Sequence, residues 1–136
     1  MLELSIKKLL DETDRVLLDI KYTSDSLYRH NVGCGISTPL AFLEHLCDMG
    51  IPTTVRQVII PTLNDNEENI LALKEIVNTH KNVDKTELLP FRKICQVKYD
   101  SMKLDFPFGS IPEPTKEKMR ELEALLRSDL KDTTQL

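Results

Sequence analysis

Apolar positions along the chain switch repeatedly between helical and strand spacing, and this switching predicts the secondary structure. Apolar residues three and four positions apart, the spacing of one helix face, recur over 2–10, 38–50, 64–79 and 115–129. Runs rich in β-branched and other apolar residues lie between them and predict strands over 15–22, 53–61 and 84–91. The alternation predicts an α/β fold whose parallel sheet is covered by helices.

Polar residues at the element ends predict where several helices begin. Thr38 is expected to cap the second predicted helix, and Thr115 is expected to cap the last. Asn64, followed three residues later by Glu67, resembles a capping box for the third. Residues 23–36 are polar and contain two glycines, so we expect mostly loop there, with a short helical turn.

The first predicted strand ends in an acid and a base two positions apart. Because side chains alternate along a strand, Asp19 and Lys21 share one face with Leu17, while the other face is apolar. Burying an unpaired charge is costly. An opposed pair at the carboxyl end of a strand therefore indicates a wet, ligand-facing pocket, where α/β sheets place their ligands.

The other two strands bring further candidates to the same end. Arg56 and Val58 lie on the second strand, and Arg92 follows the third. Together with Lys21, the two arginines suit a carboxylate or phosphate, while Asp19 suits a ribose hydroxyl, an amine or a cation. The alternative is that the charged residues of the first two strands form an internal ion-pair network that binds no ligand.

The third strand carries a further expectation about side-chain direction. Leu88, Pro90 and Arg92 are expected to share the inward face with Arg56. No residue of the chain is assigned a catalytic or metal-binding role. The three cysteines, Cys34, Cys47 and Cys95, lie far apart, which predicts reduced thiols rather than a cluster, a zinc site or disulfides.

The length of 136 residues predicts a single domain over 1–136, with a long loop at 92–114 and a polar tail at 130–136. A closed barrel of eight strand–helix units needs about 250 residues, so three units correspond to roughly half a barrel. Half a barrel leaves its inner face and two sheet edges uncovered. We therefore expect either self-association or a missing partner segment.

Charge and hydropathy exclude several classes of partner. The net charge of −4 argues against nucleic acid, whose phosphates require a basic face. No apolar run reaches the ~18 residues of a membrane span, and no secretion signal is apparent. The cytoplasm is the expected compartment.

Three segments, taken in order, resemble a known family. These are Leu-Asp-Ile-Lys at 18–21, Val-Arg-Gln-Val-Ile-Ile-Pro at 55–61 and Glu-Leu-Leu-Pro-Phe at 87–91. Their order and spacing resemble the carboxyl-terminal half of the glycyl-radical-enzyme activating enzymes, which belong to the radical S-adenosylmethionine superfamily. The likeness covers nearly the whole chain.

The resemblance implies half of a TIM-like (β/α)6 barrel and a specific chemistry. In the family a [4Fe-4S] cluster reduces S-adenosylmethionine to a 5′-deoxyadenosyl radical, which takes hydrogen from a glycine of the partner glycyl-radical enzyme. By resemblance, Asp19 and Lys21 contact the methionine carboxylate and an associated cation, and Arg56 and Val58 line the S-adenosylmethionine site. The segment 92–114 is expected either to contact the partner or to pack as a strap over the last helix.

Two departures from the family pattern limit what the resemblance implies. The cluster motif CxxxCxxC and the Gly-Gly-Glu segment, which belong to the family's amino-terminal half, are absent from this chain. Arg92 stands where many relatives carry a histidine. We therefore expect a chain that is inactive alone. The alternatives are a sugar-phosphate-binding half barrel, which should show a Gly-rich phosphate loop that is not found, and a non-enzymatic assembly domain.

Overall fold

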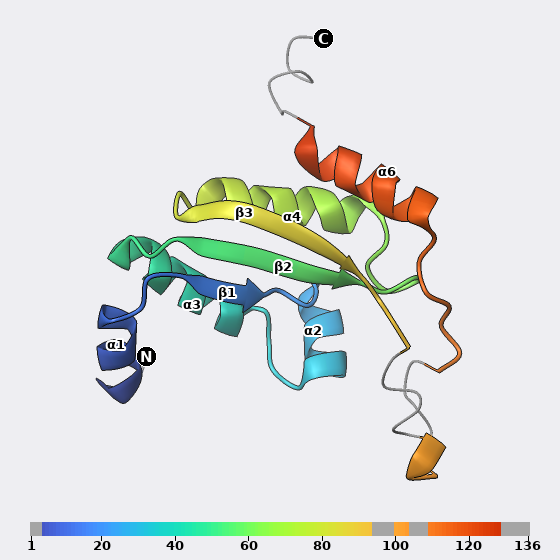
Figure 1. The fold of residues 1–136 in the computed structure, drawn as a ribbon, viewed down its shortest axis with the longest axis horizontal. Coiled ribbons are helices and arrows are strands. Elements are labelled where there is room, and N and C mark those ends of the chain that lie inside the picture. Colours follow the sequence, from blue (N-terminus) through green and yellow to red (C-terminus); the bar gives the residue numbers. More distant parts are fainter. Residues whose placement is uncertain (1–3, 94–99, 104–108, 129–136) are drawn as a thin grey trace.

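The computed structural model describes residues 4–93, 100–103 and 109–128, and it confirms the alternation of helices and strands (Figure 1). In chain order the elements are α1 (Leu4–Asp11), β1 (Val16–Asp19), α2 (Asp25–Val32), α3 (Ser37–Met49), β2 (Thr53–Ile59), α4 (Glu67–Thr79), β3 (Val83–Pro90) and α6 (Lys116–Arg127). Within these ranges, no helix combines the length and the apolar character that crossing a membrane requires.

The three strands form one parallel sheet in the order β1-β2-β3. The register places Asp19 beside Arg56, and Arg56 beside Glu87 on the third strand. One irregularity interrupts the second pairing, because Thr53 pairs with Val83 and the next residue already pairs with Lys85. The predicted parallel α/β fold is thus confirmed.

Helices cover only one face of the sheet among the described residues. In Figure 1, α3 and α4 lie behind the strands. The main core joins that face to α3, α4 and α6 through Ile20, Leu43, Val55, Ile59, Ile70, Leu73, Leu88, Leu122 and Leu126. On the opposite face Leu17 is 58% exposed. This open face carries the charged residues discussed below.

The short helical turn predicted within 23–36 is confirmed, but it belongs to a longer helix, α2, so the expectation that most of the segment is loop is wrong. Ser24 caps α2 by accepting a hydrogen bond from the amide of Leu27, and Gly33 ends it with a φ of 95°, a left-handed conformation that favours glycine. Tyr28 is buried at 3% exposure. A single buried aromatic in a polar segment gives no helical periodicity, so only tertiary packing reveals the full length of the helix.

The expected cap of α3 is also wrong. The helix begins at Ser37 after Ile36, and no side chain caps it, so Thr38 lies inside the first turn. The amide of Ile36 instead donates to the Asp25 carboxylate at 3.0 Å. Asp25 is therefore the side chain that fixes the entry to α3, and its pKa is lowered by the hydrogen bond from Arg29 and then by this one.

Asn66, rather than the predicted Asn64, caps α4, accepting a hydrogen bond from the Asn69 amide at 2.8 Å. The prediction for α6 is confirmed, because Thr115 accepts from the amide of Lys118 at 3.1 Å. The error at α4 has a physical origin. Asn64 is only 1% exposed and binds the ends of the strands, as described below.

The long loop predicted at 92–114 is described only in part. Lys93 donates from Nζ to the carbonyl of Gly109 at 2.9 Å, which ties the beginning of this segment to its later part. Residues 94–99 and 104–108, which include Cys95, lie outside the described residues, as does the predicted polar tail at 130–136. The strand before the loop spans Val83–Pro90, within one residue of the predicted 84–91 at each end.

Candidate functional site

The structure brings together three of the five predicted site residues at the carboxyl ends of β1 and β2. Arg56 donates from Nε to Asp19 Oδ1 at 3.1 Å, and Lys21 Nζ lies 3.6 Å from Asp19 Oδ2. The side chains of Arg56, Asp19 and Lys21 are 33%, 40% and 48% exposed. They form a half-exposed cluster on the open face, with one carboxylate between two cations.

The cluster has donors to spare for an anion. Among the described residues only Nε of Arg56 is hydrogen bonded, so the two terminal nitrogens of the guanidinium can form the two-pronged contact that carboxylates favour. The contacts within the chain match the alternative given above, an internal ion-pair network of these three side chains. The exposure of all three side chains nevertheless leaves them accessible to a ligand carboxylate, amine or cation, so the donor set fits the amino acid part of S-adenosylmethionine.

Val58 lies on the same face, two residues beyond Arg56. It packs against an apolar cluster formed by Tyr22, Tyr28, Ile60 and Phe91. This cluster gives the carboxyl end of the sheet a hydrophobic floor next to the charged residues. Such a combination suits a ligand with a charged end and an apolar or aromatic body.

Arg92 lies elsewhere. It is exposed, and no described hydrogen bond or ion pair joins it to the Asp19 cluster. With residues around the start of α6 it lines a separate cleft of about 420 Å³, whose other members are Pro90, Phe91, Glu113, Pro114, Lys116, Met119 and Arg120. The predicted grouping of Arg92 with Lys21 and Arg56 is therefore not seen in the described contacts.

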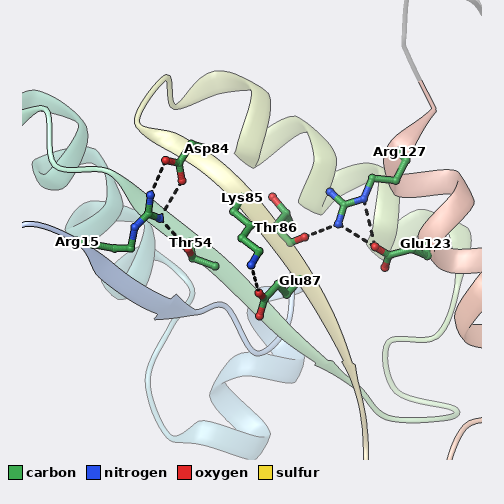
Figure 2. Close-up of polar contacts among 8 residues, drawn as sticks. All are labelled: Arg15, Thr54, Asp84, Lys85, Thr86, Glu87, Glu123 and Arg127. Atoms are coloured by element: carbon green, nitrogen blue, oxygen red, sulfur yellow. Dashed lines mark hydrogen bonds and ion pairs between the residues drawn. The ribbon is translucent and has the colours of Figure 1, made fainter.

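The predicted direction of the third-strand side chains is wrong. Leu88 pairs with Gln57 and belongs to the core on the helix-covered side, at 9% exposure. The open face of β3 instead carries Lys85 and Glu87, whose side chains pair at 2.9 Å (Figure 2). Counted from the first pair, Thr53 with Val83, an unbroken register would place Leu88 beside Val58. The extra residue, Asp84, places Leu88 beside Gln57 instead.

Sequence reasoning missed three buried amides just behind the site. Gln57, Asn64 and Asn69 are 1%, 1% and 5% exposed and hydrogen bond to one another and to the strand ends. Gln57 lies between Val55 and Ile59 on the apolar face of β2, and this is the signal that could have found the group. A buried amide needs several partners, so it marks a place where polar groups converge.

Tyr28 closes the site beneath Lys21. Its hydroxyl accepts a hydrogen bond from the backbone amide of Lys21 at 3.5 Å, and its ring meets that of Tyr22 edge to face at 6.1 Å. Burial raises the pKa of Tyr28 above its ordinary value of 10.0. The phenol is therefore neutral at pH 7 and acts as a fixed hydrogen-bonding group.

An open groove of about 980 Å³ lies between three helices and Lys21, just after β1. Its walls are mostly apolar and come from α1, α2 and α3, with Ile6, Val32 and Phe42 among them. Lys21 also lines it, so the groove meets the candidate site. His45 lines it too and has a buried Nε2 with no hydrogen-bond partner among the described residues.

The described residues do not fit an iron–sulfur cluster. They contain no group of three or more His, Cys, Asp or Glu side chains that could hold a metal ion. Cys34, between α2 and α3, and Cys47, on α3, are free thiols. The part of the chain that the structure describes thus offers groups for an organic ligand and none for a cluster.

A parallel sheet with helices on one face, and charged side chains at the carboxyl ends of its strands, is typical of part of an α/β barrel. A solved structure with this fold is a domain of pyruvate-formate lyase-activating enzyme from Bacteroides vulgatus. The TM-score is 0.71, the identity is 15%, and the match covers 90% of this chain and 66% of that one. At that identity the likeness concerns the fold alone.

The chain is also similar in sequence to several curated proteins. The chain is 38% identical to the pyruvate formate-lyase-activating enzyme of Clostridium pasteurianum over 89% of its length and 51% of the relative's. It is 32% identical to the Streptococcus mutans enzyme over 90% of its length and 47% of the relative's. It is 29% identical to the pyruvate formate-lyase 1-activating enzyme of Escherichia coli K12 over 89% and 49%. No family model matches the chain.

The resemblance to the activating enzymes of glycyl-radical enzymes is therefore confirmed, and the chain is related to the pyruvate formate-lyase-activating enzymes over about nine tenths of its length. The chain spans about half the length of the curated relatives it matches.

Proposed function

We propose that this chain is the carboxyl-terminal part of an enzyme that activates a glycyl-radical enzyme such as pyruvate formate-lyase. The observation that carries the proposal is the Asp19 carboxylate held between Lys21 and Arg56 at the carboxyl ends of two parallel strands. The kinship with pyruvate formate-lyase-activating enzymes supports it. On this proposal the open face is the S-adenosylmethionine side of the active site.

The residues of the chain then have distinct tasks. Lys21 and Arg56 bind the methionine carboxylate of S-adenosylmethionine, and Asp19 orients both cations and receives the ligand amine or an associated cation. Val58 and the apolar cluster beside it support the uncharged part of the ligand. A contact of Arg92 with the same ligand remains a prediction. When bound, S-adenosylmethionine and a [4Fe-4S] cluster supply the radical chemistry.

The rest of the site comes from outside this chain. A segment corresponding to the other half of the relatives supplies the cluster ligands, and it docks beside β1, where the sheet edge and the apolar groove are exposed. The chain alone is then inactive and acts in a cytoplasmic assembly. The segment 92–114 is the proposed contact for the glycine-bearing partner.

Calorimetry on an assembled pair tests the ligand assignment. The chain is combined with the half of the Clostridium pasteurianum relative that it does not match, and S-adenosylmethionine is titrated under anaerobic conditions. Arg56→Gln and Lys21→Ala are each expected to weaken binding about tenfold, because each removes a charge-assisted hydrogen bond worth about 1.5 kcal/mol. Lys85→Ala is the matched control, since Lys85 lies on the same face and pairs with Glu87 instead of Asp19.

Two outcomes would overturn this proposal. Equal losses in all three variants would mean that the open face binds the ligand only through its general charge. Assembly of a [4Fe-4S] cluster and cleavage of S-adenosylmethionine by the chain alone would contradict the assignment of the cluster ligands to another segment.

A further inference from the structure

Lys21 lies beyond the point where the ladder between β1 and β2 ends. The last registered pair is Asp19 with Arg56, and the last backbone hydrogen bond runs from the amide of Ile20 to the carbonyl of Arg56 at 2.9 Å. From Lys21 onward, side chains of other elements hold the backbone. The position of Lys21 is therefore set by those side chains and not by strand pairing.

Asn64, in the loop between β2 and α4, is the residue that holds both strand ends. Its Oδ1 accepts from the amide of Ile60 at 2.7 Å, and its Nδ2 donates to the carbonyl of Val58 at 2.9 Å and to that of Lys21 at 3.2 Å. It is 1% exposed. One buried amide thus spans the end of β2 and the segment after β1.

A second layer of amides holds the residues on either side of Lys21. Gln57 donates to the carbonyl of Ile20 at 3.1 Å, and Thr23 donates from Oγ1 to Asn69 Oδ1 at 2.8 Å. Asn69 donates to Gln57 Oε1 at 2.7 Å and to the carbonyl of Asn64 at 2.8 Å. Each of these groups is satisfied inside the network, so the network has one arrangement.

We propose that Asn64 is a positioning residue that holds Lys21 in the geometry in which it and Arg56 share Asp19 and receive a ligand carboxylate. Asn64 lies behind the site and acts through the backbone of Lys21. This inference rests on the proposed function for the identity of the ligand. A constellation of binding groups needs such support because its own side chains are half exposed and have rotational freedom.

Asn82 provides a matched comparison at the opposite end of the sheet. Its Nδ2 donates to the carbonyl of Ile51 and to Thr53 Oγ1, both at 3.0 Å. Asn82→Ala therefore also removes two hydrogen bonds donated by a side-chain amide near the end of a strand. It changes nothing near Lys21, so it measures what the loss of such bonds does to the fold alone.

The first measurement uses the ¹⁵N-labelled chain without ligand and follows the Arg56 Nε–H group, which Asn64 does not touch. In Asn64→Ala its hydrogen exchange is expected to accelerate about tenfold, because the Lys21–Asp19–Arg56 arrangement loosens. In Asn82→Ala it is expected to stay unchanged once both variants are corrected for their global free energies of unfolding. Asn64→Asp should match Asn64→Ala, since it keeps the acceptor for Ile60 but has no amide for Lys21.

The second measurement titrates S-adenosylmethionine into the assembled pair. Asn64→Ala is expected to bind about three- to tenfold more weakly because the hydrogen bond to the carbonyl of Lys21 is lost, while Asn82→Ala binds as the unaltered chain does. If the unaltered pair binds no S-adenosylmethionine, the proposed function fails, and the Arg56 Nε–H measurement still decides whether Asn64 positions the cluster.

Equal effects of the Asn64 and Asn82 variants on the Arg56 Nε–H group would overturn the inference. If Asn64→Ala does not fold, Asn64→Ser replaces it. That variant keeps a small polar side chain at the buried position but is too short to reach the carbonyl of Lys21. Faster exchange at Arg56 in Asn64→Ser supports the inference, and unchanged exchange refutes it.

Discussion

The two edges of the sheet differ in whether their outward-pointing backbone groups are available to pair with another strand. At the β3 edge, Arg127 Nη2 donates to the carbonyl of Thr86 at 2.6 Å, and Glu123 holds the guanidinium at 2.8 Å (Figure 2). Pro90 on the same edge has no amide hydrogen to offer, and its backbone faces outward because the amide of Phe91 bonds inward to Ile59. Two outward positions of this edge, Thr86 and Pro90, are therefore poor partners for another strand.

The β1 edge has no such protection among the described residues. The amides of Val16 and Ile20 bond toward β2, to the carbonyls of Pro52 and Arg56. By alternation, the backbone groups of Leu17 and Asp19 point outward. No described strand lies beyond them, and the apolar groove reaches Lys21, two residues after Asp19.

This difference indicates that an additional strand can pair with the sheet at β1 and not at β3. An α6 side chain and a proline stop growth at β3, while β1 offers a hydrogen-bonding edge next to an apolar surface. The candidate ligand residues Asp19 and Lys21 belong to the strand at the open edge. A strand that pairs with β1 would therefore also lie next to the candidate site.

The largest expected effect comes from blocking the open edge. Leu17→Pro removes an outward amide and adds bulk to the edge, while every bond to β2 stays intact. Association with the unmatched half of the Clostridium pasteurianum relative should weaken about 100-fold, as measured by analytical ultracentrifugation. Leu17→Ala is the control, because it shortens the same exposed side chain but keeps the amide, and it should associate normally.

An intermediate effect is expected from opening the closed edge. Arg127→Ala leaves the carbonyl of Thr86, a residue that is 4% exposed, without its donor, which should lower the free energy of unfolding by about 1 kcal/mol in urea titrations. The variant should also self-associate at high concentration through β3. Arg120→Ala on the same helix is the control, since Arg120 is exposed and makes no described hydrogen bond. A monomeric Arg127→Ala chain would show that Pro90 alone closes this edge.

The smallest effect is expected from the contact between Arg15 and Asp84, which joins the two outer strands at their amino ends. Arg15, just before β1, donates to both carboxylate oxygens of Asp84 on β3, at 2.9 and 2.6 Å, and also to Thr54 at 2.9 Å (Figure 2). The hydrogen bonds from Arg15 lower the pKa of Asp84 below its ordinary value of 3.8. Both side chains are about half exposed, so the stabilisation is small.

The sign of its pH dependence follows from the lowered pKa. The folded state binds the Asp84 proton less tightly than the unfolded state, so the stabilisation is complete above the unfolded pKa and is lost as the pH falls through the folded one. The melting temperature should therefore be higher for the unaltered chain than for Asp84→Asn at pH 7. The two should converge as the pH falls below 3.8. A constant difference down to low pH would show that Asp84 acts through its shape and not its charge.

The sequence predicted those parts of the molecule that local pattern determines. The three strands and the meeting of Asp19 with Arg56 follow from β-branched runs, from side-chain alternation and from the parallel arrangement. The cap at Thr115 follows from its local sequence. The strands and the cap need only neighbouring residues, and the pair of Asp19 with Arg56 needs in addition only the parallel order of two adjacent strands.

The features that were predicted wrongly or not at all depend on contacts between residues far apart in the sequence. The parity of β3 depends on the extra residue at Asp84, which only the pairing with β2 reveals. Asn64 has the local sequence of a helix cap, and its binding to Lys21 depends on the distance between two strand ends. Arg92 follows β3 as predicted, but its neighbours come from around the start of α6.

The edge-to-face pair of tyrosines under Lys21 has an optical consequence. The chain contains no tryptophan and three tyrosines, and the two tyrosines among the described residues are Tyr22 and Tyr28. Tryptophan emission, which masks tyrosine fluorescence in most proteins, is absent. The chain therefore carries an intrinsic fluorophore beneath its charged cluster, so events at Lys21 can be followed by ultraviolet emission without any label.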